Sequence, residues 1–354
     1  MNPDKLYYEH QFYIYEMRLP FILLLTVVSV YGIAQTVPRT YVAQYTNQSI
    51  TVDGEMEQEW DDVEWTVDFI DIEGEITPKY KTRVKMLWDS TYLYFYADLF
   101  EPHVWGDIAE RDAVIFYNND FEVFIDPDGD THNYMEFEMN ALNTVWDLFL
   151  TKPYRNGPRV IDNWDIKGIK TAVKINGTLN DPSDLDEGWN VEIAMPWSAL
   201  LEATTNKLPV NDYWRINFSR VNWDYELENK IYIRKKDENG QYLPEYNWVW
   251  SPQRVINMHE PEHWGFVYFS QGPEDFEAPS DELLKRKLYE VYRSIHERKL
   301  NLEDSDYFTV TFQNQEIPVH FERHLTGWNI WIVSPNTDKR IAIKEDGKSS
   351  ISIN

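Results

Sequence analysis

The sequence predicts a mainly β fold: an antiparallel β-sandwich over residues 35–270, followed by a small α+β appendage over residues 271–354. Three observations predict this class. Apolar and polar side chains alternate with a period of two through the middle of the chain. Turn residues separate the short alternating segments, and no long helical pattern precedes residue 280. Short strands joined by turns in this way are typical of a sandwich.

The clearest hairpin lies between residues 121 and 141. The strand FEVFID (121–126) is followed by the turn sequence PDGD and by the return strand NYMEFEMNA (133–141). A register shift of one residue would move every side chain to the other face. The alternation therefore predicts a polar sheet face that carries Glu122, Glu136, Glu138 and Asn140. Further strands are expected at 81–89, 92–98, 171–177, 189–196, 213–220 and 264–270, and a helical turn at 196–201.

The appendage is marked by a change of pattern. After the acidic, Pro-containing stretch GPEDFEAPSDE near residues 270–280, apolar residues recur at helical spacing from Leu283 to Ile295. Short strands are expected at 307–312, 318–323 and 327–334. Nothing in this part resembles a site, so a stabilising or docking module of unknown role is expected.

The N-terminus carries the apolar run FILLLTVVSVYGIA (21–34), preceded by Arg18. It is too short to cross a bilayer, which takes about 20 helical residues. The small residues Gly32 and Ala34 favour a signal peptide over residues 1–34 that is cleaved before Gln35. Met17 is an alternative start, and an uncleaved anchor is the alternative outcome. A secreted or periplasmic bacterial protein is expected, without stable membrane insertion after cleavage.

The net charge of the chain limits the classes of molecule that it can bind. The chain has 60 acidic and 33 basic residues, a net charge of -27, and no cysteine. Nucleic acid and anionic lipid would be repelled, and disulfides, thiolate catalysis and Cys-ligated metals are excluded. Residues 35–270 hold 42 of the acids, 20 of the bases and 13 of the 15 Trp. The acids and the rings therefore belong to the predicted sandwich.

Seven stretches in the middle of the chain, taken in order, resemble the family 9 carbohydrate-binding modules and their DOMON-like relatives. The resemblance implies a β-sandwich that binds sugars, usually as an accessory to plant-polysaccharide hydrolases, and sometimes with structural calcium. The stretches are ITVDGEMEQEW (50–60), VKMLWDSTYLYFYADLFEPHV (84–104), NNDFEVFIDPDGD (118–130), YMEFEMNALNTVWDLFL (134–150), GWNVEIAMPWSAL (188–200), WRINFSRV (214–221) and HEPEHWGFVYF (259–269).

The family's sugar clamp is only partly present. In the best-understood members two Trp side chains hold the sugar, and the matching positions here are Phe116, with Tyr117 beside it, and Met258. The family's carboxylate matches Glu122, and its Arg on the return strand is replaced by Glu138. The resemblance therefore implies the fold and the general role, whereas the clamp itself differs.

The chemistry of sugars selects candidates independently. The C–H faces of a sugar stack on aromatic rings, and its hydroxyls pair with carboxylates and amides. For each Trp, packing in the core is the competing interpretation. The stacking candidates are Trp105, Phe116, Tyr117, Trp146 and Trp250, and the candidates for hydroxyls are Glu122, Glu138 and Asn140.

Two motifs suggest metals. The segment HEPEH (259–263) satisfies H-E-x-x-H, but Pro261 disfavours the helix that a zinc protease needs, so a loop entering the last strand is expected. Asp126, Asp128 and Asp130 resemble a calcium loop, although Phe137 occupies the twelfth position, where an EF-hand has Glu. The alternatives for this segment are a solvated hairpin turn and a calcium site.

The sequence thus predicts an exported, non-catalytic protein that binds poly- or oligosaccharide in support of polysaccharide degradation. A glycoside hydrolase or lyase on the same sandwich is one alternative, because some pair of carboxylates among so many acids will always have suitable spacing. A DOMON-like module that binds haem or a metal is another. Its potential ligands are His103, His132, His259, His263, Met135, Met139 and Met258.

Overall fold

The computed structural model describes residues 38–353 except 158–159, 204–206 and 301–307. The predicted signal peptide lies outside the described residues. Within them, no helix combines the length and the apolar character needed to cross a bilayer.

A curled sheet forms the body of the molecule. Thirteen strands of the described chain belong to it, in the order β8-β7-β6-β5-β11-β15-β1-β3-β4-β10-β9, with β14 attached to β11 and β2 attached to β14. The strands are β1 (Thr40–Tyr45), β2 (Ile70–Asp71), β3 (Thr82–Trp88), β4 (Tyr92–Leu99), β5 (Asp120–Asp126), β6 (Tyr134–Asn140), β7 (Val145–Leu150), β8 (Val160–Ile161), β9 (Lys170–Asn176), β10 (Gly188–Pro196), β11 (Tyr213–Asn222), β14 (Tyr246–Val249) and β15 (Gly265–Ser270).

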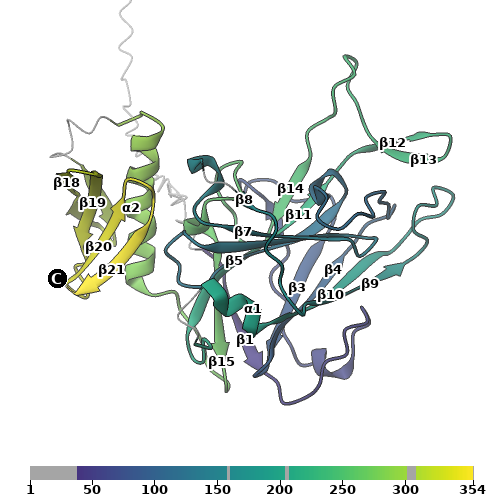
Figure 1. The fold of residues 1–354 in the computed structure, drawn as a ribbon, viewed down its shortest axis with the longest axis horizontal. Helices are drawn as coiled ribbons and strands as arrows, with labels where there is room; N and C mark the ends of the chain where they lie inside the picture. Colours follow the sequence, from purple (N-terminus) through teal and green to yellow (C-terminus); the bar gives the residue numbers. More distant parts are fainter. Residues whose placement is uncertain (1–37, 158–159, 204–206, 301–307, 354) are drawn as a thin grey trace, which may run out of the picture. The chain divides into compact units, whose positions relative to one another are not determined.

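The sheet folds back on itself into two layers, which confirms the predicted sandwich. In Figure 1, β3, β4, β10 and β9 run side by side in one layer, and β5, β7 and β11 lie in the other. Phe95 of β4 meets Phe218 of β11 with ring centroids 5.5 Å apart, so the two layers share one core. Most pairings are antiparallel, but β1 pairs in parallel with both β15 and β3. Alternation fixes which face a side chain takes and leaves strand direction open.

The predicted helical turn is α1 (Trp197–Leu200), and a small separate hairpin is formed by β12 (Tyr225–Glu228) and β13 (Ile231–Arg234). Most of the tryptophans pack inside. Trp60, Trp88, Trp189, Trp250 and Trp264 are among the largest fully buried side chains. Burial of large rings on this scale supplies much of the hydrophobic stabilisation of such a core.

The C-terminal residues form the predicted α+β unit. The helix α2 (Ser280–His296) packs its apolar face, which includes Leu284 and Leu288, against two small antiparallel sheets. Their strands are β16 (Thr309–Phe312), β17 (Gln315–Pro318), β18 (His320–His324), β19 (Gly327–Val333), β20 (Lys339–Lys344) and β21 (Ser349–Ile353).

Candidate functional site

The predicted polar face of β5 and β6 exists, and it is buried. Phe121, Val123 and Ile125 of β5 point into the core, so Glu122 points to the outer face of the layer. Glu122 lies directly opposite Glu138 on β6. The exposed fractions of Glu122 and Glu138 are only 6% and 2%. The register was predicted correctly, but these side chains are covered by other segments of the chain.

Burial shapes the electrostatics of this face. Removal from water raises the pKa of Glu122 to about 7. Burial, and then the charge of neighbouring carboxylates, holds the pKa values of Asp120, Glu136 and Glu138 well above their usual range. The Phe116 N–H donates to Glu138 Oε2 at 3.1 Å. These four side chains, Asp120, Glu122, Glu136 and Glu138, are called the carboxylate cluster below.

Asn140 supports a turn. Its Oδ1 accepts hydrogen bonds from the backbone N–H groups of Leu142 and Thr144, at 3.0 and 3.1 Å. Its Nδ2 donates to Ile108 O at 2.8 Å. The amide of this fully buried side chain is therefore engaged by the protein itself.

The predicted stacking residues are not gathered at one place. Trp250 lies in the main core, where its ring centroid is 5.8 Å from that of Phe218. Trp105 is buried and stacks on Tyr232 in a separate small cluster. Trp146 and Met258 are partly buried and pack together with a third cluster around Trp264.

Tyr117 is the exposed member of the predicted set. It ends the short 3-10 helix η2 (Ile115–Tyr117), and 46% of its surface is exposed. The Arg234 guanidinium lies 4.6 Å from the centre of the Tyr117 ring and 4.7 Å from that of Trp223. Phe116 lies beside Tyr117, with ring centroids 4.6 Å apart. The surface at η2 is therefore aromatic and cationic.

The predicted calcium loop is a hairpin turn with many internal hydrogen bonds. The two carboxylate oxygens of Asp126 accept from the N–H groups of Gly129 and Thr131. Lys348 forms an ion pair with Asp130 at 2.8 Å. One oxygen each from Asp126, Asp128 and Asp130 lies within 4.8 Å of the others, and calcium binding here stays a prediction.

The HEPEH segment is not the helix of a zinc protease. Residues Pro261–His263 form one short 3-10 turn, η5, which leads into β15 as expected. Glu262 is occupied by a two-pronged ion pair with Arg293 of α2, at 2.7 and 3.0 Å. The motif therefore joins the sandwich to α2.

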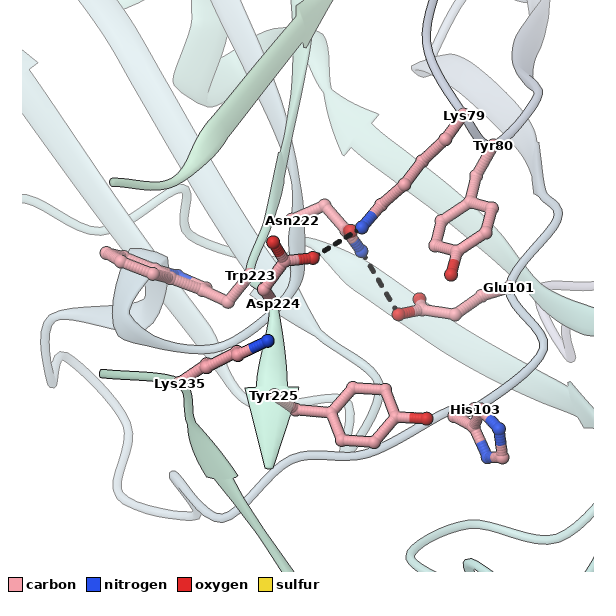
Figure 2. Close-up of a pocket in the computed structure, with 9 residues that line it drawn as sticks. All are labelled: Lys79, Tyr80, Glu101, His103, Asn222, Trp223, Asp224, Tyr225 and Lys235. Atoms are coloured by element: carbon pink, nitrogen blue, oxygen red, sulfur yellow. Dashed lines mark hydrogen bonds and ion pairs between the residues drawn. The ribbon is translucent and has the colours of Figure 1, made fainter. Parts of the chain in front are cut away.

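A cavity of about 170 Å³ lies at the end of β11 (Figure 2). We call it the Glu101 pocket. Its side chains come from four separate stretches: the segment before β3, the segment after β4, the end of β11 with the start of β12, and the residue after β13. They are Lys79, Tyr80, Glu101, His103, Asn222, Trp223, Asp224, Tyr225 and Lys235.

Glu101 forms the inner wall of this pocket. Its carboxylate accepts from Arg220 Nη2 at 3.0 Å, Trp189 Nε1 at 2.9 Å and Asn222 Nδ2 at 3.1 Å, so its orientation is fixed. Asn119 also donates to it. A buried carboxylate with this many donors is held rigidly in place.

The outer wall is charged and partly exposed. Lys79 Nζ lies 2.6 Å from Asp224 Oδ1, and Figure 2 shows this contact across the mouth of the pocket. Although burial opposes the effect, the hydrogen bond and charge of Lys79 lower the pKa of Asp224. Tyr225 and His103 line the same side with their rings 5.3 Å apart.

Sequence reasoning did not predict the pocket, and of its lining it had singled out only His103, as a possible ligand of haem or a metal. The signal nearest to it is the run Asn222–Tyr225 (NWDY), where aromatic and polar residues follow a strand directly. Apart from Lys235, its other walls come from residues more than a hundred positions earlier, and no local pattern indicates them.

Part of the chain is similar to known proteins. Residues 52–213 match the family described as carbohydrate family 9 binding domain-like. Two solved structures of a family 9 carbohydrate-binding module from Caldicellulosiruptor kristjanssonii, one with cellotriose and one with glucose, are similar to the chain. Their identities are 17% and 18%, they match 68% of this chain and 98% and 100% of their own, and both TM-scores are 0.43. No curated protein is similar to the chain.

The molecule is thus a β-sandwich protein, and a little under half of its chain, residues 52–213, matches this family.

Proposed function

We propose that the chain is an exported, non-catalytic protein that binds a poly- or oligosaccharide in support of polysaccharide degradation. The family of residues 52–213 supports sugar binding. Export is supported by the apolar run 21–34 with its small residues before Gln35.

We propose the Glu101 pocket as the sugar site, and its lining is the observation that carries the proposal. Sugar hydroxyls both donate and accept hydrogen bonds. The wall offers the acceptor Asp224, the donors Lys79 and Lys235, and the Tyr225 ring, while Glu101 fixes its inner end. A concave site that combines rings with a few fixed polar groups is the usual form of a small-ligand site.

A binding role is favoured over hydrolysis at this site. The inner carboxylate, Glu101, is engaged by Arg220, Trp189 and Asn222. The outer one, Asp224, is engaged by Lys79 and by the Tyr246 hydroxyl at 3.1 Å. Glu101 therefore orients the pocket wall, and Asp224 is the carboxylate that hydroxyls of a bound sugar would meet.

The test is calorimetric titration of the purified protein with soluble cello-, xylo- and pectic oligosaccharides. At least one should bind, and Tyr225→Ala or Lys235→Ala should weaken binding about tenfold, a loss of about 1.4 kcal/mol. Tyr154→Ala is the matched control, because Tyr154 is an exposed tyrosine outside the pocket lining. Binding that is unchanged in folded Tyr225→Ala and Lys235→Ala proteins would move the site elsewhere. Failure of every sugar would remove the proposed function.

Two further measurements test the proposed absence of catalysis and the proposed cleavage of the signal peptide. Release of reducing ends from the bound polysaccharide should stay at the level of the blank, since no catalysis is proposed. N-terminal sequencing of the protein recovered from its native cell should begin at Gln35. Retention of residues 1–34 on the mature protein would contradict cleavage.

A further inference from the structure

The carboxylate cluster has a geometry that the proposed sugar pocket does not use. One carboxylate oxygen each from Asp120, Glu122 and Glu138 lies within 4.8 Å of the other two. All three side chains are buried, and Glu136 adjoins them on β6. Like charges this close and this dry repel one another strongly unless something neutralises them.

One carboxylate oxygen of Asp120 has no hydrogen-bond partner, which suggests that a cation is bound there. The side chain of Asp120 is fully buried; one of its oxygens, Oδ1, accepts from the Val221 N–H at 3.1 Å. The other, Oδ2, has no hydrogen-bond partner. A buried acceptor without a partner costs about 1–3 kcal/mol, and more when it is charged. A bound cation would remove this cost.

Arg220 supplies a positive charge to this region, but its two terminal nitrogens are hydrogen-bonded elsewhere, and its Nε has no hydrogen-bond partner. Arg220 acts on Asp120 through its charge. Its Nη2, however, donates to Glu101, and its Nη1 donates to Thr82 Oγ1 and Phe100 O, each at 3.0 Å. These groups lie on the side of the Glu101 pocket.

We propose that Asp120, Glu122 and Glu138 bind a divalent calcium ion on the outer face of β5 and β6. Calcium takes six to eight oxygen ligands at about 2.3–2.6 Å, so oxygens on opposite sides of one ion lie up to about 5 Å apart. Three oxygens within 4.8 Å of one another can therefore share an ion. Second carboxylate oxygens and water complete the shell.

The site is distinct from the Asp126–Asp130 turn. In that turn the oxygens of Asp126 already accept two backbone N–H groups, and Lys348 neutralises Asp130. In the carboxylate cluster an oxygen is free, and no such lysine pair is formed by its three proposed ligands among the ion pairs of the described residues.

The ion would also steady the neighbouring pocket. Asp120 follows Asn119, whose Oδ1 accepts from the Trp223 N–H at 2.7 Å. Trp223 lines the Glu101 pocket. Calcium at Asp120 would therefore fix the start of β5 against the end of β11, where the pocket wall begins.

The experiment uses the whole chain, freed of metal with a chelator and titrated with calcium chloride alone at neutral pH, without sugar. We expect one binding event and a rise of several degrees in the melting temperature, with magnesium weaker. Asp120→Asn and Glu138→Gln should abolish both effects. Asp128→Asn, in the exposed part of the hairpin turn, and Asp184→Asn, an exposed acid, are the matched controls and should keep them.

Two results would overturn the proposal: no calcium binding by the metal-free wild type, or binding that survives Asp120→Asn and is lost in Asp128→Asn. Because no sugar is present, either result is independent of the proposed function. If Asp120→Asn and Glu138→Gln fail to fold, terbium luminescence decides. Trp146 lies opposite Glu138 across β6 and β7, so terbium should be sensitised in the wild type and much less in Trp146→Phe. Equal emission from the two proteins would contradict the site.

Discussion

Arg220 Nη2 lies 3.0 Å from Glu101 Oε2, and neither side chain is more than 3% exposed. This ion pair joins the end of β11 to the segment after β4. Breaking a buried pair leaves the other charge without its partner, which typically costs about 3–5 kcal/mol. The pair therefore supports both the sandwich and the wall of the Glu101 pocket.

Arg220→Met should lower the free energy of unfolding by about 3–5 kcal/mol, measured by urea denaturation. Adding Glu101→Gln to this variant should recover part of the loss, because the unpaired charge is then removed. Lys299→Met removes the exposed pair with Glu297 and should cost less than about 1 kcal/mol. A loss for Arg220→Met as small as that of Lys299→Met would contradict the role of burial.

Trp250 should behave as a core residue. Its ring fills the space beside Gly265, where an added Cβ would lie 2.6 Å from the ring carbon Cη2. Gly265→Ala should therefore destabilise the protein by about 1–3 kcal/mol through overpacking. Trp250→Ala should cost about 3–5 kcal/mol through the cavity it leaves.

The same pair gives an internal control. In a Trp250→Phe background the smaller ring leaves room, so Gly265→Ala should cost less than it does in the wild type. Sugar affinity should be unchanged in folded Trp250→Phe protein. A clear loss of affinity there would return Trp250 to the set of ligand-binding residues.

His259 should make the free energy of unfolding depend on pH in the acidic range. Burial, and secondarily the charge of Arg155, lowers the pKa of His259 to about 4. Between pH 6.5 and 4 the unfolded chain therefore binds a proton that the folded chain does not, and stability falls as the pH falls. Above pH 6.5 the residue contributes no pH dependence.

His259→Gln should remove that component, worth up to about 3 kcal/mol between pH 7 and pH 4. Urea unfolding of wild type and variant across this range measures the difference. The Tyr134 hydroxyl, which hydrogen-bonds His259 Nδ1 at 2.8 Å, can still meet the Gln amide. His320→Gln, an exposed histidine, is the control and should leave the pH dependence as it is.

The ion pair between Glu262 and Arg293 should hold α2. Glu262→Gln leaves the half-buried guanidinium of Arg293 with a weaker partner, so amide hydrogen exchange in residues 280–296 should accelerate. Exchange in β5 and β11 should change much less. Lys287→Gln removes the more exposed pair with Glu290 and should leave α2 as protected as in the wild type.

Local pattern predicted the sandwich well because alternation is a property of single strands. The pairing of Glu122 with Glu138 follows from the same alternation and from a tight turn. The parallel pairing of β1 could not be predicted in this way. It depends on β15, a neighbour in the sheet that lies more than 200 residues later in the sequence.

Burial of the polar face was also beyond local pattern. Glu138 is covered in part by η2, where the Phe116 N–H donates to it from 22 positions away in the chain. The Glu101 pocket joins Lys79 to Asp224 across 145 positions. Contacts over such separations are set by the packed fold, and neither composition nor spacing encodes them visibly.

The turn between β5 and β6 is closed by the far end of the chain. Lys285 Nζ donates to Gly129 O at 2.7 Å, the Thr131 hydroxyl donates to Gly347 O at 3.1 Å, and the Ser349 N–H donates to Asp130 O at 3.1 Å. A truncated protein that contains only residues 35–270 would therefore lose these contacts with the hairpin that carries Glu122 and Glu138. A fusion protein that uses the sandwich should therefore also include residues 271–354.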